Sequence, residues 1–255
     1  MPLELLTIPC LSDNYAFLVH DPATGATALV DVPEAAPIAK ALANKGWTLS
    51  HILLTHHHWD HVDGLAALLA DHPAIVVGAA TDAHRLPPLD IALSEGETIE
   101  IGSESATVID VSGHTVGHIA YHFPDSALLF TADSLMALGC GRLFEGTPEM
   151  MFDSLSKLAA LPPETTLCSG HEYTQSNAKF ALTIEPENSA LISRVGAIDT
   201  ARAAGQPTVP STLADELATN PFLRGHIPEV QTSVGLPGAD PAVVFAEVRK
   251  RKDAF

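Results

Sequence analysis

Residues 51–61 read HILLTHHHWDH, a short apolar run followed at once by four imidazoles and one carboxylate. The run HILLT is typical of a buried strand. The polar residues begin where this strand ends. They are therefore expected in a loop at the edge of a sheet, where a rigid scaffold can direct several side chains into one cleft. The feature predicts a fold with a sheet and a functional edge.

The first half of the chain alternates β-rich runs with turn residues, which is typical of a sheet-forming domain. Strands are predicted over residues 16–21, 27–32, 51–55, 74–79, 98–102, 106–111, 118–123 and 127–132. Helices are predicted over residues 34–45, 64–70 and 150–161, and the last of these ends at two prolines. The mixture of strands and helices predicts an α/β domain.

From about Asn177 onward, strand-like runs disappear, and helical patterns separated by Pro and Gly take their place. Helices are predicted over residues 189–204, 211–218 and 241–252, the last with Asp240 as its N-cap. We therefore expect a boundary near residue 174, with an α/β domain over residues 1–173 and a small helical domain over residues 174–255.

The composition excludes several classes of function. With 46% hydrophobic and 17% charged residues, the 255-residue chain fits a soluble globular protein. Its formal charge of −18 argues against nonspecific nucleic-acid binding, which depends on Lys and Arg. No apolar run approaches the roughly 18 residues of a membrane span, and the N-terminus does not read as a signal peptide. Three cysteines without a CxxC pair, Cys10, Cys140 and Cys168, favour reduced thiols, so we expect a cytoplasmic protein.

The polar cluster at residues 56–61 offers two pairs of metal ligands. His56 and His58 are two residues apart and can point the same way, while Asp60 and His61 can form a second pair. Imidazole nitrogen with carboxylate oxygen is a ligand set for zinc, or for iron and manganese. His57 is expected to point away from this face. Two pairs are too few for complete sites, so further ligands must come from elsewhere.

Three further candidates each follow a predicted strand, namely His114, Asp133 and His171. His56, His58 and His114 can hold one metal, Asp60, His61 and His171 a second, and Asp133 can bridge both. Two bridged metals share a water whose pKa falls towards ~7, which gives hydroxide at neutral pH. A lone histidine is more often structural, and we interpret His20, His51, His72, His84, His118, His122 and His226 in that way.

With these residues assembled, the sequence resembles the metallo-β-lactamase superfamily, whose HxHxDH signature stands at residues 56–61. Within it, the chain is similar to the glyoxalase II (hydroxyacylglutathione hydrolase) family over nearly its whole length. The segments that carry this likeness are DNYAFLV, THHHWDH, GCGRLFEGT, GHEYT, SNAKFAL, EPEN, NPFLR and the terminal RKRKDAF. The resemblance implies an αββα sandwich followed by a helical substrate-binding domain.

The resemblance also implies the reaction, which is hydrolysis of S-D-lactoylglutathione to D-lactate and glutathione, the second step of methylglyoxal detoxification. It places the metal ligands on the same seven residues and implies two divalent ions, with zinc expected and iron or manganese as alternatives. The implied glutathione contacts are Arg142, Phe144, Tyr173, Arg249 and Lys252. We expect a monomer with a small-molecule glutathione thioester as its partner, and neither nucleic acid nor membrane.

Under this interpretation, the basic residues near the C-terminus are expected to bind glutathione. Arg249 and Lys252 are three residues apart on a predicted helix, so they share a face and can meet an anionic tripeptide. Lys250 and Arg251 are interpreted as a solvated helix end. The chain departs from many relatives at Asp63, where they have Gly, at residues 131–134, where they have TGDT, and at Phe144, where some have Tyr.

The expected mechanism is attack of a metal-bridging hydroxide on the thioester carbonyl, with Asp60 and Asp133 as catalytic residues. Asp60 would orient the hydroxide. The thiol leaving group has a pKa around 8.5 and can depart as an anion without a general acid.

Four alternatives stay open. One is another hydrolase on the same fold, acting on lactams, lactones or other thioesters, and another is a persulfide dioxygenase-like enzyme with a single iron. The third is a diiron flavoprotein reductase, which places Glu where His58 stands, and the fourth is a noncatalytic metal-binding role.

Overall fold

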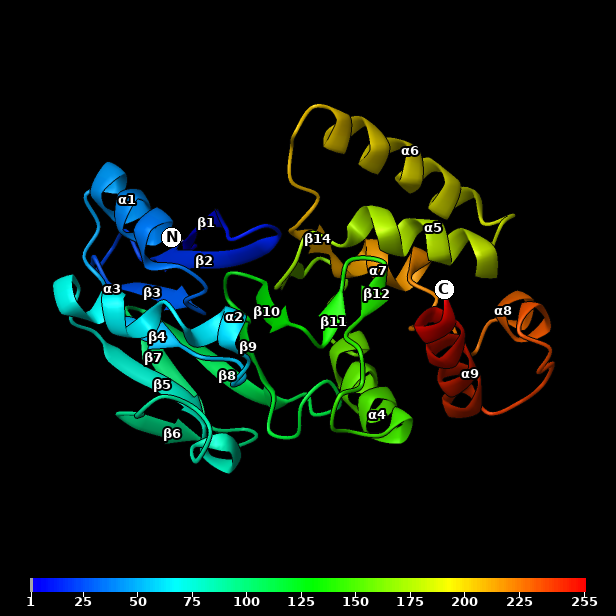
Figure 1. Cartoon of the computed structure of the whole chain (residues 1–255), viewed down its shortest axis with the longest axis horizontal. Helices are drawn as coiled ribbons and strands as arrows, with labels where there is room; N and C mark the ends of the chain where they lie inside the picture. Colours follow the sequence, from blue (N-terminus) through cyan, green and yellow to red (C-terminus); the bar gives the residue numbers. More distant parts are fainter. Residues whose placement is uncertain (1) are drawn as a thin grey trace. The chain divides into compact units, whose positions relative to one another are not determined.

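The computed structural model describes residues 2–255 and separates into two compact units (Figure 1). Unit 1 contains the chain up to Val111 together with Val116–Thr131. Unit 2 contains Ser112–Thr115 and Ala132–Phe255. The sequence placed its division near residue 174 by composition, and that assignment of domains stays a prediction.

The first sheet of unit 1 has the order β1-β2-β3-β4-β5-β6. Its strands are β1 (Glu4–Cys10), β2 (Asn14–His20), β3 (Thr27–Val30), β4 (His51–Leu53), β5 (Ile75–Ala79) and β6 (Ile91–Leu93). The first three strands pair antiparallel, and the pairs from β3 to β6 are parallel. The continuous apolar run predicted as a buried strand is β4, which lies inside the sheet between β3 and β5.

The second sheet of unit 1 is an antiparallel set of four strands in the order β10-β9-β8-β7. These are β7 (Thr98–Ile101), β8 (Glu104–Asp110), β9 (Ile119–Phe123) and β10 (Leu128–Ala132). The burial of alternate residues in β7 and β8 leaves one face towards the core. The two sheets pack face to face: the Phe17 and Phe130 rings are 5.6 Å apart, and the Tyr121 hydroxyl donates to the Leu54 carbonyl at 2.9 Å.

Helices α1 (Ala35–Lys45) and α3 (Leu65–Asp71) cover the first sheet of unit 1 (Figure 1). Their buried apolar residues, Ile38 and Leu42 in α1 and Leu65 and Leu68 in α3, recur at the spacing of one helix face. α1 ends at Gly46, whose φ of 68° closes the helix with a left-handed cap. The helices predicted at 34–45 and 64–70 are therefore confirmed.

Unit 2 contains two short strand pairs and six helices among the residues described. The strands are β11 (Leu135–Met136), β12 (Gly139–Cys140), β13 (Thr166–Ser169) and β14 (Ser211–Thr212). The helices are α4 (Pro148–Ala159), α5 (Thr174–Ile184), α6 (Ser189–Ala203), α7 (Leu213–Thr219), α8 (Pro228–Ser233) and α9 (Pro241–Ala254). The predictions for α4, α6, α7 and α9 are confirmed within a few residues, whereas α5 and α8 were not predicted.

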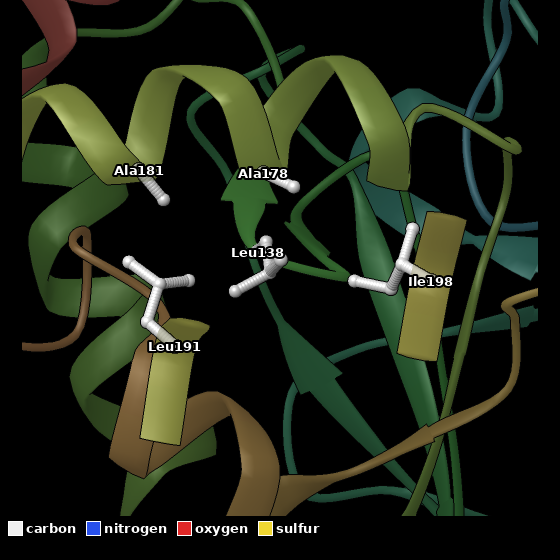
Figure 2. Close-up of a cluster of buried hydrophobic side chains, with 5 residues drawn as sticks. All are labelled: Leu138, Ala178, Ala181, Leu191 and Ile198. Atoms are coloured by element: carbon white, nitrogen blue, oxygen red, sulfur yellow. The ribbon is translucent and has the colours of Figure 1, made fainter. Parts of the chain in front are cut away.

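A small apolar core of unit 2 fixes the turn between β11 and β12. Leu138 in this turn packs against Ala178 and Ala181 of α5 and against Leu191 and Ile198 of α6 (Figure 2). All five side chains are nearly inaccessible to solvent. Burial of a Leu side chain stabilises a fold by about 1.5–3 kcal/mol, so this cluster holds the turn firmly against the helices.

A buried polar network holds the same turn from α7. The Glu216 side chain is fully buried, accepts from the Leu138 amide at 2.8 Å and pairs with Arg194. The Asn220 amide donates to the carbonyls of Met136 (3.1 Å) and Gly139 (3.0 Å). Because a buried carboxylate is tolerated only when it is paired, this network specifies one position for the β11–β12 turn.

The three cysteine thiols are buried and form no disulfide. Burial raises the pKa of the Cys10 thiol to about 12 and that of Cys140 to about 11, and it also raises the pKa of Cys168. Thiols of this kind are uncharged at neutral pH and react poorly. Among residues 2–255, no helix combines the length and apolar character needed to cross a membrane.

Candidate metal centre

Unit 1 gathers the histidines of the opening motif. His56 and His58 lie in an extended segment after β4, and Asp60 and His61 lie on the one-turn helix α2 (Trp59–Val62). The sequence predicted a loop over the whole motif, but the chain turns into a helix at Trp59. The His56 ring centroid is 4.2 Å from that of His61 and 4.8 Å from that of His58. The motif therefore presents its imidazoles as one cluster.

Asp31, which sequence reasoning missed, orients two of these rings. Its Oδ2 accepts from His61 Nδ1 at 2.7 Å and from the Thr55 hydroxyl at 2.8 Å, and the Thr55 Oγ1 lies 3.0 Å from His56 Nδ1. Because a carboxylate only accepts, His61 carries its proton on Nδ1, and His56 in turn donates to Thr55. Both rings keep Nε2 as a lone-pair donor for a metal.

The signal for Asp31 was present in the sequence. It directly follows the strand β3, as Asp133 directly follows β10. Its φ of 56° and its exposed fraction of 2% mark a constrained, buried carboxylate, and neither property is readable from the sequence.

Asp60 and His57 also have fixed partners in unit 1. The Asn14 side-chain amide donates to Asp60 Oδ2 at 3.1 Å and to the Asp60 carbonyl at 3.0 Å, which orients the carboxylate. His57 Nδ1 donates to Asp82 Oδ2 at 2.8 Å, and its exclusion from the ligand set stays a prediction. His118, interpreted as structural, is fully buried and stacks on His56 with centroids 4.5 Å apart.

Unit 2 gathers the three other predicted ligands around one carboxylate. Asp133 Oδ2 lies 3.5 Å from His114 Nε2 and 3.3 Å from His171 Nε2. The Gly170 amide donates to the Ala132 carbonyl at 2.9 Å, which places the residue before His171 next to the residue before Asp133. All three ligand side chains are buried, with 4–6% of each residue exposed. One carboxylate oxygen therefore lies close to both ring nitrogens, and its bridging role stays a prediction.

The segment after β12 fixes the His114 ring. His114 Nδ1 donates to the Arg142 carbonyl at 2.7 Å, so its Nε2 is the lone-pair donor that faces Asp133. A Cβ on Gly141 would lie 1.9 Å from the Asp133 carbonyl oxygen and 3.0 Å from His114 Nδ1. Only glycine permits this close approach, which gives the GCGR segment a physical role.

The donor set fits a pair of divalent metals. The seven predicted ligands are imidazoles and carboxylates without thiolates, as in catalytic rather than structural zinc sites. Three of the histidines have Nδ1 committed to a hydrogen bond, so Nε2 is the ring nitrogen that carries the lone pair. Each unit brings together its own share of the ligands. The assembly of all seven into one centre stays a prediction.

Two exposed aromatic residues of unit 2 flank its ligand histidines. Phe144 is 62% exposed and contacts the His114 ring edge-to-face at 5.3 Å, with the Arg142 guanidinium 5.8 Å from the Phe144 ring centroid. Tyr173 is 41% exposed and stacks on His171 at 4.7 Å. Three of the predicted substrate contacts, Arg142, Phe144 and Tyr173, are therefore exposed to solvent beside predicted ligands.

Arg249, a predicted substrate contact, is buried and serves the loop beside the ligands. Its Nη1 donates to the Cys140 carbonyl at 3.0 Å, and its Nη2 donates to Asp253 at 2.8 Å. The buried Nε–H has no hydrogen-bond partner among residues 2–255. A buried cationic donor without a partner costs free energy.

Lys252 lies on the same helix, with its Nζ 5.3 Å from the Phe180 ring centroid. Burial lowers the pKa of this ammonium group, and the nearby Arg249 guanidinium lowers it further.

Comparison with known proteins supports the same picture. Residues 12–171 match the family model described as metallo-beta-lactamase superfamily, and residues 172–255 match the model described as hydroxyacylglutathione hydrolase C-terminus. A hydroxyacylglutathione hydrolase of Cereibacter sphaeroides is 66% identical over 255 residues, which is the full length of both chains. The fold is thus a metallo-β-lactamase fold followed by a helical C-terminal domain, as predicted.

Two solved structures are also similar. ETHE1 from Myxococcus xanthus superposes with a TM-score of 0.66 at 25% identity, covering 100% of this chain and 99% of that one. A structure described as a di-iron-bound form superposes with a TM-score of 0.56 at 30% identity, covering 66% of this chain and 91% of that one.

Proposed function

Because the chain belongs to the metallo-β-lactamase superfamily and, within it, to the hydroxyacylglutathione hydrolases, we propose that it hydrolyses S-D-lactoylglutathione to D-lactate and glutathione. One structural observation carries the proposal beyond the family likeness. A single carboxylate oxygen, Asp133 Oδ2, lies within 3.5 Å of ligand nitrogens that we assign to two different metals. With His114 assigned to one metal and His171 to the other, this oxygen would be shared between the two metals.

The proposed centre would hold two zinc ions. His56, His58 and His114 would hold the first, Asp60, His61 and His171 would hold the second, and Asp133 would be a ligand to both. When bound, such a pair supplies Lewis-acid polarisation and a water acidic enough to be deprotonated near neutral pH. The all-nitrogen-and-oxygen donor set supports zinc, and it also suits iron or manganese.

The residues of this chain prepare the centre before any substrate arrives. Asp31 and Thr55 hold the rings of His61 and His56, and Asn14 holds the carboxylate of Asp60. These partners remove rotational freedom from the ligands, so little reorganisation is needed when the thioester binds. Asp60 and Asp133 are the proposed catalytic residues, because both would be ligands of the metals that activate the attacking water.

Glutathione is proposed to bind beside the centre along unit 2. Phe144 and Tyr173 would pack on the substrate near His114 and His171, and Arg142, Arg249 and Lys252 would receive its carboxylates. The exposure of both rings and the three cationic groups on an acidic protein support this assignment. The departing thiol has a pKa around 8.5, so it leaves as a thiolate without a protein acid.

We propose that the two domains predicted from the sequence have separate roles. Residues 1–173 carry the metal ligands, and residues 174–255, the helical domain, carry Arg249 and Lys252. We place the enzyme in the cytoplasm as a monomer, and the three buried, unlinked thiols agree with a reducing compartment.

The first test is thioester hydrolysis with a metal count on the same purified sample. We expect turnover of S-D-lactoylglutathione, about two metals per chain, and loss of both after chelation with recovery on adding zinc. If the protein binds two metals but does not hydrolyse S-D-lactoylglutathione, the proposed substrate is wrong, and lactones and other thioesters should be assayed next. A single iron with oxygen uptake would instead indicate persulfide dioxygenase chemistry.

Replacing Arg249 by Ala is expected to lower kcat/KM by about 10- to 100-fold, mainly through KM, because a hydrogen bond to a charged group contributes about 1.5–3 kcal/mol. Steady-state kinetics with the glutathione thioester measures both kcat/KM and KM. The matched control is Arg251→Ala on the same helix, since Arg251 contacts Glu247 and the carbonyls of Ser233 and Val234. Equal KM changes in both variants would contradict a substrate contact at Arg249.

A further inference from the structure

A buried carboxylate outside the proposed ligand set joins three segments of unit 1. Asp82 ends the short 3₁₀ helix Ala80–Asp82 that follows β5, and its side chain is fully buried. One oxygen accepts from His57 Nδ1 at 2.8 Å, and the other accepts from Arg85 Nε. Because burying an unpaired charge is costly, these two partners and Asp82 depend on one another for position.

The same network extends to the segment after His114. Arg85 also donates from Nη2 to the Val116 carbonyl at 2.7 Å. Gly117 approaches so closely that a Cβ there would lie 2.9 Å from the Asp82 Cβ. Asp82, with Arg85, therefore fixes residues 57 and 116–117 relative to each other within unit 1.

The two segments fixed in this way are the ones that lead to the ligands assigned to the first metal. His57 stands between His56 and His58 in the chain, and Val116 follows His114 by two residues. Among the interactions described for residues 2–255, the unit 1 ligands assigned to the second metal make no contact with Asp82, and Asp31 holds His61 while Asn14 holds Asp60. Asp31 also reaches His56 through Thr55, so it is an anchor common to both sets. The network around Asp82 thus serves one ligand set and not the other.

We propose that Asp82 is a positioning residue for the first metal, acting through His57 and Arg85 on the backbone that carries His56, His58 and His114. This inference rests on the ligand assignment of the proposed function. It predicts selectivity: loss of the Asp82 charge loosens one metal site and leaves the other as it was. A purely structural role would weaken the whole fold without distinguishing the sites.

The test is competition of zinc between a chromophoric chelator and the full-length protein. The wild type should give two dissociation constants, and Asp82→Asn should raise one of them by about 10- to 100-fold while the other stays within about twofold. Asp21→Asn is the matched control. Asp21 is equally buried in unit 1 and accepts from Ala23 and Ser103 amides, each at 2.8 Å. It should lower the melting temperature without changing either constant.

Conservative replacement of His57 supplies a second readout. His57→Asn keeps a side-chain N–H near the position of Nδ1 and should retain most of the zinc affinity, whereas His57→Ala should resemble Asp82→Asn. Unchanged constants in Asp82→Asn, or an equal rise in both that Asp21→Asn reproduces, would overturn the proposal. Turnover by the wild type is measured separately. If the wild type binds two metals but does not hydrolyse the thioester, the proposed function is wrong. The zinc affinities of Asp82→Asn and Asp21→Asn would still decide whether Asp82 positions the first metal.

Discussion

Replacing Asp133 by Ala is expected to lower kcat/KM for the thioester by about 10³-fold or more and to leave about one metal or fewer per chain. The reason lies in the position of Oδ2, which is 3.5 Å from His114 Nε2 and 3.3 Å from His171 Nε2. No other carboxylate of unit 2 contacts both rings among the interactions described for residues 112–115 and 132–255. Without it, two cations would face each other with one less negative charge between them.

The measurement pairs steady-state kinetics with elemental analysis of the dialysed protein. Ser134→Ala is a suitable control, because Ser134 is the next residue, is fully buried and has no carboxylate. It should retain both metals and change turnover by less than about tenfold. An Asp133→Ala protein with full metal content and wild-type turnover would refute the bridging role.

Replacing Gly141 by Ala is expected to cost at least about 10²-fold in kcat/KM, although the change adds only one methyl group. The new Cβ would lie 1.9 Å from the Asp133 carbonyl oxygen and 3.0 Å from His114 Nδ1. The backbone must therefore move by roughly an ångström at the point where Asp133 and His114 are held. Because the Arg142 carbonyl that orients His114 belongs to the next residue, the ring loses its hydrogen-bond geometry as well.

Gly196→Ala provides the contrast for this prediction. Gly196 lies in α6, and nothing stands within 4 Å of a Cβ built there. That variant should be stabilised by about 0.5–1 kcal/mol, since Ala loses less backbone entropy than Gly in a helix. Steady-state kinetics and thermal unfolding of Gly141→Ala and Gly196→Ala measure these two effects. Wild-type kinetics in Gly141→Ala would show that the segment relaxes away from the ligands.

Most of the secondary structure was predictable because it depends on local patterns. Continuous apolar runs gave the buried strands, and helical spacing with Pro and Asp at the ends gave α4 and α9. β1 was missed because its sequence ELLTIPC ends in Pro and Cys. An edge strand tolerates Pro, since it does not need every backbone donor. α5 was missed because TQSNAKFALTI mixes polar and β-branched residues, and its apolar face forms only against α6 and the β11–β12 turn.

The sequence by itself determined the candidate ligands, because ligand chemistry belongs to residue type and the strand-end placement of His and Asp is a local pattern. Only the tertiary structure decided which groups orient those ligands. Asp31 and His61 are 30 residues apart, and His114 and Arg142 are 28 apart. His57 and Asp82 are separated by 25 residues, and Gly141 touches the Asp133 backbone across the β11–β12 hairpin. Contacts of this kind depend on how sheets, turns and helices pack, and no local pattern encodes them.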